Sequence, residues 1–358
     1  MTQNRQFFEK IKDFDIYSIS PFCHTRIVDG VTSRISRISS YLRSEVRHMV
    51  IIMRGNHNKN SFFEQQTLSY FGSENKIVHL LDVRVLFFIK KNILNSKKPI
   101  LYIHSIWWFF YAFSCRILFG IPYIFDDHNV EFDRFYSTKR YFMLPWIFLI
   151  EALLVYFSKY VVVGSDSDKN RLKQLYGNKN KFYTIGIRIE RNINLSQTEI
   201  INQYSIPLKK IKLLFFGSFS YGPNLEALRY LESQIIPNLT DDCILFICGK
   251  DLPIPLLFDK NKIRYLGFVE DIDSFISISD YILAPIFSWG GVKTKILHAM
   301  SYDKIIITTE EGIRGIKPPL YPMYENFVVS NKENYLSTFL RTISVWPSQV
   351  ISHYSENI

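Results

Sequence analysis

The sequence predicts an α/β protein made of two doubly wound parallel sheets, one in each half of the chain. Three observations lead to this prediction. Short apolar runs recur along the 358 residues, segments with helical spacing separate them, and a polar stretch at residues 191–210 divides the pattern into two. A chain of this length also exceeds what one compact core accommodates, which favours two domains.

The first half contains seven predicted strands. Each is a nearly continuous apolar run, as expected for a strand that helices cover on both faces. Between them lie segments such as 33–46, "SRISRISSYLRSEV", whose apolar residues recur at helical spacing. The predicted strands are residues 15–20, 48–53, 76–81, 99–105, 122–127, 160–165 and 181–186.

The second half repeats the pattern with six further runs. We therefore expect a first domain over residues 1–190, a linker over 191–210 and a second domain over 211–335, with a final helical segment over 336–358. The predicted strands of the second domain are residues 211–218, 243–249, 263–269, 281–287, 304–310 and 326–330.

Positive charge is concentrated in the first half. The whole chain carries a net charge of +10, but residues 1–190 hold 27 Lys and Arg against 16 Asp and Glu, whereas residues 191–358 hold 16 against 17. This asymmetry favours an anionic partner for the first domain, such as a membrane surface, a lipid phosphate or nucleic acid. Compositional drift in a Lys-rich proteome explains it equally well, and no nucleic-acid recognition motif accompanies it.

The cysteines and the N-terminus bear on the compartment. Cys23, Cys115, Cys243 and Cys248 are scattered without metal-ligand spacing, so we expect no metal site and a reducing compartment. The N-terminal residues "MTQNRQFFEKIKDFD" contain no apolar signal-peptide core. These observations predict a cytoplasmic protein.

The stretch Tyr141–Phe157 is almost long enough and apolar enough to span a membrane. Pro145 and Glu151 interrupt it, and a predicted strand follows directly. We interpret it as a buried or interfacial helix instead of a transmembrane one.

Ligands of doubly wound sheets bind beyond the carboxyl ends of the strands, so the residues that end strands are candidates for a site. Neither G-x-G-x-x-G after the first strand nor a P-loop motif occurs, which disfavours a nicotinamide enzyme and a P-loop NTPase. The D-x-D triplets Asp166/Asp168 and Asp271/Asp273 precede helical patterns, where capping is a simpler role than metal binding. The strand-ending candidates are Asp126–His128, Ser165, Asp166, Gly217, Ser218, Gly249, Lys250, Val269, 288–295 and 308–312.

The segment "SWGGVKTKILHAM", Ser288–Met300, has the composition of a phosphate site. Gly290 and Gly291 allow close approach of the backbone, and the helix start that follows offers free N–H groups to an anion. Lys293 and Lys295 add positive charge, and Thr294, Lys295 and His298 share one helical stripe with Gly291. An ordinary helix start with solvated lysines is the alternative.

Five segments in this order resemble the retaining GT-B glycosyltransferases of the group 1 (family 4) type. "IPYIFDDHNVEFDR" resembles a family strand that ends in His-Asn-x-Glu, and "YVVVGSDSDKNRLKQLYG" resembles the next strand and helix. The donor domain is represented by "LLFFGSFSYGPNLEALRYL", "IRYLGFVEDIDSFISISDYILAP" and "GGVKTKILHAMSYDKIIITTEEGIRGI". The resemblance implies two Rossmann-like domains that face a central cleft, with residues 336–358 returning to the first domain.

The resemblance also implies a reaction. The second domain would bind a nucleotide diphosphate sugar, as co-substrate and without a cofactor or metal, and the first domain would bind the acceptor. Sugar transfer would retain configuration, and the catalytic candidates are His128, which matches a histidine near the reacting carbon, and His298. The donor-binding candidates are Gly30, Gly217, Ser218, Val269, Gly290, Gly291, Lys293, Thr294 and Lys295.

Two departures from the family pattern leave alternatives open. Many members carry two glutamates eight positions apart, and these positions are Gly290 and His298 here. A carboxylate accepts hydrogen bonds from two hydroxyls, whereas a neutral imidazole has one acceptor, so nucleotide binding would be weaker or altered. An arginine expected in the opening of the donor domain is also absent from "GSFSYGPN".

The leading hypothesis is a hexosyltransferase in surface polysaccharide or glycan biosynthesis. It would act on a glycan or polyprenyl-linked acceptor and sit peripherally on the cytoplasmic face of the membrane, against an anionic surface. The alternatives are a catalytically silent GT-B protein, acting as a partner subunit or a glycan-binding module, and a sugar-nucleotide epimerase.

Overall fold

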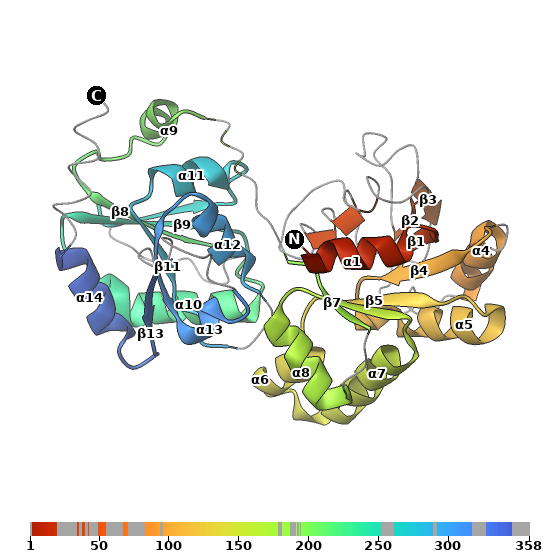
Figure 1. The fold of residues 1–358 in the computed structure, drawn as a ribbon. Coiled ribbons are helices and arrows are strands. Elements are labelled where there is room, and N and C mark those ends of the chain that lie inside the picture. The colour runs from red at the N-terminus through yellow and green to blue at the C-terminus, as the bar shows by residue number, and fades with distance from the viewer. Residues whose placement is uncertain are drawn as a thin grey trace. The chain divides into compact units, whose positions relative to one another are not determined.

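The computed structural model divides into two compact units, and each is described by itself. The first consists mainly of Met1–Ile187, and the second of Arg188–Ser288 and Lys293–Ile358. Figure 1 shows the elements of both units. The structure describes residues 2–19, 34–35, 38–39, 42, 49–54, 67–70, 83–93, 96–177, 181–186, 191, 193, 195–251, 261–288, 292–316 and 327–345.

The first unit contains a seven-stranded sheet in which all pairings are parallel, in the order β3-β2-β1-β4-β5-β6-β7. This order reverses direction between β1 and β4, which makes their carboxyl ends the expected ligand edge. The strands are β1 (Asp15–Ile19), β2 (Met49–Arg54), β3 (Thr67–Tyr70), β4 (Pro99–Ile103), β5 (Tyr123–Asp127), β6 (Tyr160–Val163) and β7 (Phe182–Thr184).

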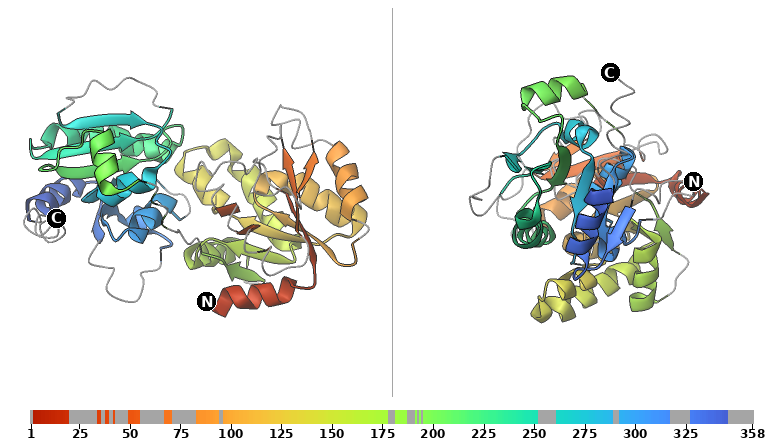
Figure 2. Two further views of the ribbon diagram at one scale, coloured as in Figure 1. Left: turned by 90° about the horizontal axis from the view of Figure 1, so that it is seen from above. Right: turned by 90° about the vertical axis from the view of Figure 1, so that its left-hand side faces the viewer.

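Helices cover both faces of this sheet, as Figures 1 and 2 show. Leu101 and Ile103 of β4 pack on the face that carries α4, α5 and α7, whereas Ile100 and Tyr102 pack on the face of α1. This alternation is the strand period of two and explains why β4 is a continuous apolar run. The helices are α1 (Thr2–Ile11), α4 (Val83–Ile93), η1 (Ile106–Trp108), α5 (Phe109–Phe119), α6 (Glu131–Ser137), η2 (Tyr141–Met143), α7 (Leu144–Phe157) and α8 (Asp166–Tyr176).

The second unit contains a six-stranded parallel sheet in the order β10-β9-β8-β11-β12-β13. Its order reverses between β8 and β11, so the second unit has the same strand arrangement as the first six strands of the first unit. The strands are β8 (Ile211–Phe216), β9 (Cys243–Cys248), β10 (Ile263–Gly267), β11 (Tyr281–Ala284), β12 (Ile305–Thr309) and β13 (Phe327–Ser330).

The second sheet is also covered on both faces. Leu213 and Phe215 pack with α10 and α14, whereas Leu214 and Phe216 pack with α9, α11 and α12. The helices are α9 (Gln197–Gln203), α10 (Gly222–Tyr230), η3 (Leu231–Ile235), η4 (Ile236–Asn238), α11 (Ile272–Ile278), α12 (Thr294–Ser301), α13 (Glu310–Ile313) and α14 (Tyr335–Val345).

Most predicted strands agree with the structure to within two or three residues, and three differences are informative. The predicted strand 76–81 lies outside the described residues, and β3 was not predicted because "TLSY" has neither an apolar run nor a clear alternation. The predicted linker 191–210 contains α9, which begins with a capping box between Ser196 and Glu199 and buries Ile200.

The end of the chain also differs in part from the expectation. Phe339 of α14 lies in the predicted segment 336–358 and is buried, together with Tyr335, in the core of the second unit, so the described part of this segment packs on the sheet of the second unit. Residues 346–358, the remainder of the predicted returning segment, lie outside the described residues.

Candidate functional site

The turn after β8 lies at the point where the second sheet reverses order, and it is built on two glycines. Gly217 has φ of 149°, a conformation that L side chains rarely adopt, and its N–H donates to the Cys248 carbonyl over 3.0 Å. A Cβ on Gly249 would lie 1.9 Å from the Gly217 carbonyl oxygen. The turn is therefore compact, and its backbone polar groups are not covered by side chains of these two residues.

Asn224, in the first turn of α10, connects this turn to α12. Its Nδ2 donates to the Ser218 carbonyl over 2.8 Å, and its Oδ1 accepts a hydrogen bond of 2.5 Å from the Lys295 ammonium. The ammonium also lies 4.9 Å from the centroid of the Phe215 ring. These contacts bring together Lys295, Gly217 and Ser218, three predicted donor-binding residues, around an asparagine that sequence reasoning missed.

The surroundings lower the charge of Lys295. Burial, reinforced by the nearby positive charge of Lys293, lowers the pKa of the Lys295 ammonium to about 7. An asparagine oxygen accepts a hydrogen bond but supplies no negative charge to oppose this effect. Among the described residues, the Lys295 ammonium contacts Asn224 and Phe215 and no carboxylate, so an anionic ligand would stabilise its protonated form.

The start of α12 adds a second feature suited to an anion. Lys293 occupies the N-cap position and is buried, and Thr294 is the first residue of the helix. A lysine side chain has no acceptor, so the residue that begins α12 cannot cap its N–H groups as Ser or Asp would. The helix start thus presents partial positive charge beside Lys293 and Lys295.

His298, three residues after Lys295, is paired with a carboxylate. Its Nε2 lies 2.8 Å from Oδ1 of Asp273, and the Tyr302 hydroxyl donates to the same oxygen. Asp271 caps α11 by accepting from the Ser274 N–H over 3.1 Å. Capping therefore explains Asp271, whereas Asp273 places a carboxylate beside the position where the family resemblance led us to expect a glutamate.

Several other candidates have no role in these contacts. Val269 follows β10 and packs, half-buried, against the core that contains Phe216 and Ile296. Gly30, Gly290 and Gly291 lie outside the described residues. At the triplet Asp166/Asp168, Ser165 caps α8 and exchanges hydrogen bonds with Asp168 over 2.7 and 3.0 Å, so the cap is a serine instead of the expected aspartate.

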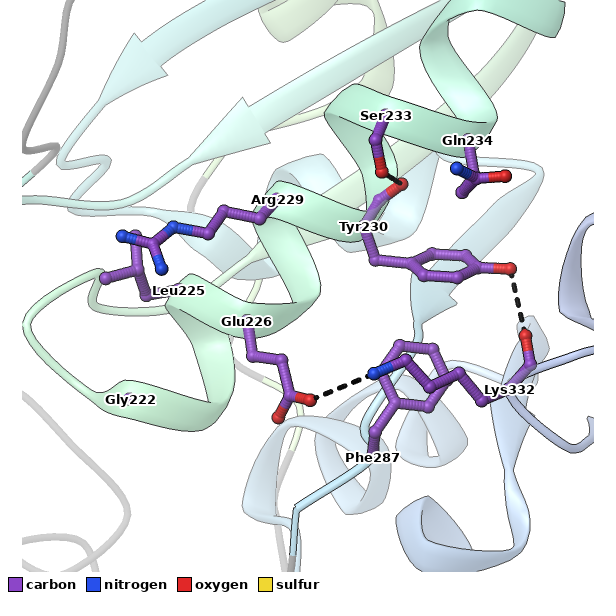
Figure 3. Close-up of a pocket in the computed structure, with 9 residues that line it drawn as sticks. All are labelled: Gly222, Leu225, Glu226, Arg229, Tyr230, Ser233, Gln234, Phe287 and Lys332. Carbon is purple, nitrogen blue, oxygen red and sulfur yellow. Dashed lines mark hydrogen bonds and ion pairs between the residues drawn. The ribbon is translucent and has the colours of Figure 1, made fainter. Parts of the chain in front are cut away.

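A hollow of about 580 Å³ lies along α10, as Figure 3 shows. Glu226 on its wall accepts hydrogen bonds from Ser288 and, over 3.4 Å, from Lys332. The Tyr230 hydroxyl donates to the Lys332 carbonyl over 3.2 Å. The residues that line it are Gly222, Leu225, Glu226, Arg229, Tyr230, Ser233, Gln234, Phe287 and Lys332, none of which is a predicted site residue.

In the first unit, a buried network surrounds Asp126 at the end of β5. Its Oδ1 accepts a hydrogen bond of 2.7 Å from Arg34, and its Oδ2 lies 3.2 Å from His104 Nδ1 and 3.3 Å from His128 Nε2. His104 follows β4 at the point where this sheet reverses order, and its Nε2 lies 2.6 Å from the Ser18 hydroxyl. The predicted catalytic candidate His128 therefore shares one carboxylate with a second histidine.

The charges of this network follow from burial and pairing. Burial alone would raise the pKa of Asp126, but Arg34 and the two histidines hold the pKa of that carboxyl well below its usual range. Burial also lowers the pKa of His104, despite the opposing effect of Asp126. Near neutral pH, Asp126 is thus a carboxylate paired with Arg34, and His104 is a neutral imidazole.

The same three groups have the composition of a metal-ligand set. The ligand atoms of His104, Asp126 and His128 lie within 4.8 Å of one another. However, Arg34 already occupies one oxygen of Asp126 and would lie beside a bound cation. The described contacts therefore account for the cluster as a charge-balanced hydrogen-bond network, and the absence of a metal stays a prediction.

The residues after His128 are positioned by Glu151 of α7. Its carboxylate accepts hydrogen bonds from the N–H of Glu131 over 2.7 Å and of Phe132 over 3.3 Å, which caps α6, and from the Tyr176 hydroxyl over 2.6 Å. Burial raises the pKa of Glu151 to about 7. Asp127 lies in the same buried environment, where desolvation and the charge of Glu151 raise its pKa well above the usual range.

Arg34, His104, Asn224 and Glu151 are structural members of these networks that sequence reasoning did not assign to a site. His104 carried a detectable signal, because it is the first residue after β4 and that edge of the sheet is where ligands bind. Asn224 lies in the first turn of α10, the helix that follows the Gly217 turn. Arg34 carried none, since 92 residues separate it from Asp126.

Comparison with solved structures defines the fold as GT-B. Sucrose-phosphate synthase from Thermosynechococcus elongatus matches with a TM-score of 0.73 at 12% identity, over 93% of this chain and 90% of that one. HepE from Anabaena in complex with UDP and glucose matches with a TM-score of 0.69 at 11% identity over 93% and 89%. WaaG, a glycosyltransferase involved in lipopolysaccharide biosynthesis, matches with a TM-score of 0.62 at 14% identity over 96% and 95%.

The sequence comparison is more local. Residues 210–336, which contain β8 to β13, match the family described as Glycosyl transferases group 1. A search among curated proteins finds no significant match. The resemblance to group 1 glycosyltransferases is thus confirmed for residues 210–336, while retention of configuration and the family 4 type stay predictions.

Proposed function

We propose that the protein is a glycosyltransferase that takes a hexose-type sugar from a nucleotide diphosphate sugar. The observation that carries the proposal is the position of Lys295, whose ammonium meets Asn224 at the ligand edge of the second sheet. The cation, the helix start and the compact Gly217 turn together suit a diphosphate. In transfer, the same groups would stabilise the negative charge that develops on the leaving diphosphate.

The match of residues 210–336 to group 1 glycosyltransferases supports this assignment. HepE, which has the same fold, is described in complex with UDP, with UDP-glucose, and with UDP and glucose. By analogy we infer a uridine or related nucleotide sugar as the donor. Lys293, Lys295 and the helix start would neutralise the diphosphate without a metal, and transfer would proceed with retention.

We further propose that the acceptor is a glycan or a polyprenyl-linked intermediate in the synthesis of a surface polysaccharide. The excess of basic residues in the first half of the chain suits an acceptor at an anionic surface. The protein would then act peripherally on the cytoplasmic face of the membrane. His128, held beside Asp126, is the residue of the first unit that we assign to the reaction.

The proposal is tested by nucleotide binding and turnover on the full chain. Thermal unfolding is measured with UDP, GDP, ADP, CMP and dTDP, because a ligand that binds only the folded protein raises the melting temperature. We expect one nucleotide to stabilise the wild type and not Lys295→Met, while Lys209→Met, an exposed lysine of the same unit, behaves as the wild type. Donor hydrolysis or transfer is then measured with the corresponding nucleotide sugars.

The alternative is a catalytically silent GT-B protein that serves as a partner subunit or binds glycans. It is motivated by His298, whose Nε2 is engaged with Asp273. Nucleotide-dependent stabilisation without any hydrolysis or transfer would favour this alternative. Absence of both binding and turnover with every donor would contradict the proposal.

A further inference from the structure

Helix α7 is apolar on two opposite sides, and only one side is buried. Ile147, Glu151 and Leu154 face the core of the first unit and are almost completely buried. The other side is accessible, with Phe142 of η2 exposed by 80% and Trp146 by 67%. A surface helix of a soluble protein normally has a polar outer face, so this arrangement requires an explanation.

The accessible side forms a single stripe. Phe142, Trp146, Leu149, Leu153 and Tyr156 recur at intervals of four, three, four and three residues, which aligns them along one face of η2 and α7. Leu153 is half-buried and the other four are exposed. We call these five residues the outer stripe.

Neighbouring helices on the same side of the sheet continue the apolar surface. Helix α5 packs against α7, with the rings of Phe113 and Phe157 at 6.1 Å, and it exposes Ile117 and Leu118. Helix α4 packs against α5 in turn and exposes Phe87. Figure 1 shows these three helices on the first unit. Exposed apolar residues on three helices that pack side by side are typical of an interaction site.

The exposed charges of η2, α7, α5 and α4 and of the residues just before η2 are basic. Lys139 and Arg140 directly precede η2, which begins the outer stripe. Helices α4 and α5 contain basic residues but no Asp or Glu. The one acidic residue of η2 and α7 is Glu151, which is buried and caps α6. The surface therefore combines exposed aromatic and aliphatic side chains with a basic margin.

We propose that the outer stripe, with Ile117 and Leu118 of α5 and Phe87 of α4, binds an anionic lipid bilayer. An apolar face with aromatic residues and a basic margin is the pattern of a helix that lies in the headgroup region. None of the described helices is long and apolar enough to cross a membrane, so α7 would lie along the surface. Charge decides against a second copy of the chain, because two such surfaces would oppose their basic margins.

This inference deepens the proposed function, since it assigns the surface that would bring the enzyme to a lipid-linked acceptor. The vesicle experiments that test it do not depend on that function. Co-sedimentation is measured with vesicles of phosphatidylcholine alone and of phosphatidylcholine mixed with phosphatidylglycerol. We expect binding to the mixed vesicles, weakening with added salt, and little binding to phosphatidylcholine alone.

Two pairs of variants separate the apolar and the electrostatic contributions. Trp146→Glu should abolish vesicle binding, whereas Leu208→Glu, which replaces an exposed leucine of the second unit, should leave it unchanged. The double variant Lys139→Ser/Arg140→Ser should weaken binding by roughly tenfold or more, from about 1 kcal/mol per basic residue near the surface. Lys209→Ser is the matched charge control.

Trp146 also reports its own depth. Lipids brominated on their acyl chains should quench the tryptophan fluorescence of the wild type more strongly than that of Trp146→Phe, although exposed Trp107 is also present. Equal quenching of the wild type and Trp146→Phe, or equal binding of wild type and Trp146→Glu, overturns the assignment. A wild-type dimer that Trp146→Glu converts to a monomer, without vesicle binding by either, would identify a second copy as the occupant instead.

The lipid-binding surface and the donor site can each be contradicted without contradicting the other. Loss of vesicle binding with intact nucleotide stabilisation contradicts the lipid surface alone. Vesicle binding by a chain that no nucleotide stabilises contradicts the donor site alone.

Discussion

The guanidinium of Arg34 donates a hydrogen bond of 2.7 Å to Asp126, and both side chains are almost completely buried. A second Arg34 nitrogen donates to the Ile185 carbonyl over 2.9 Å. The pair thereby joins three distant segments of the first unit behind His104 and His128. Because His128 is exposed by only 9% of its side chain, its orientation depends on this network.

Removing one partner of this pair should be costly. In Arg34→Met the Asp126 carboxylate is left buried without its cation, and we expect a loss of about 3–5 kcal/mol in the free energy of unfolding. The double variant Arg34→Met/Asp126→Asn should lose less than the sum of the single variants, since neither charge remains. Urea unfolding measures all three. Glu9→Gln, which breaks the exposed pair with Lys12, is the control and should change nothing measurable.

Gly217, which directly follows β8, and Gly222, which begins α10, provide a matched pair of substitutions. An Ala Cβ at position 217 would lie 2.5 Å from Asn224 Nδ2 in a strained backbone conformation, so Gly217→Ala should lose about 1–3 kcal/mol of stability and displace Asn224. Gly222→Ala meets no atom within 4 Å and should be neutral. Nucleotide binding should weaken in Gly217→Ala alone. Equal effects in both variants would contradict the role given to this turn.

Nucleotide binding should depend on pH through Lys295. The pKa of the ammonium is about 7 in the free protein, and a bound diphosphate would raise it, so binding takes up a proton. Affinity should therefore fall as pH rises above 7, approaching tenfold per pH unit. Calorimetry in buffers of different ionisation enthalpy measures the proton uptake. Lys295→Met should bind weakly and lack this uptake, which also controls for titration of the nucleotide itself.

Glu151 should make stability depend on pH in the opposite sense from an ordinary surface carboxylate. Its pKa is raised from 4.5 to about 7, so between these values the folded chain holds a proton that the unfolded chain has released. Stability from this group therefore increases as pH falls from 7 to 4.5. Glu151→Gln should lose this contribution and, at pH 8, about 1–3 kcal/mol from altered capping of α6. A constant difference between the variant and the wild type over this range would contradict the assignment.

Much of the fold could be predicted because a buried parallel strand leaves a direct signal in the sequence. Runs such as "CILFIC" and "YVVV" became β9 and β6, since both faces of these strands are covered by helices. Strand β3 was missed because the four residues of "TLSY" mix polar and apolar types. Helix α9 was missed because the polar stretch around it suggested a linker, although Ser196 and Glu199 form a capping box there.

The site was predictable only where it follows a strand or opens a helix. This rule proposed Gly217, Lys295 and His128 as candidates but not Arg34 and Asn224, because the roles of the latter two depend on contacts between separate elements. Asp273 shows a related limit. We assigned it to capping from its position before a helix, but its carboxylate is bonded to His298 and Tyr302. Only the packing of α11 against α12 reveals that pairing.

The two sides of α7 also set the rules for redesigning this protein. Positions 146 and 149 face outward and can be replaced by polar residues to improve handling in aqueous buffer without touching the core. Positions 147, 151 and 154 face inward, and the carboxylate at 151 holds the backbone three residues beyond His128. A wholesale exchange of the helix for a hydrophilic one would therefore remove the support of a candidate catalytic residue, whereas substitutions confined to its outer side would preserve it.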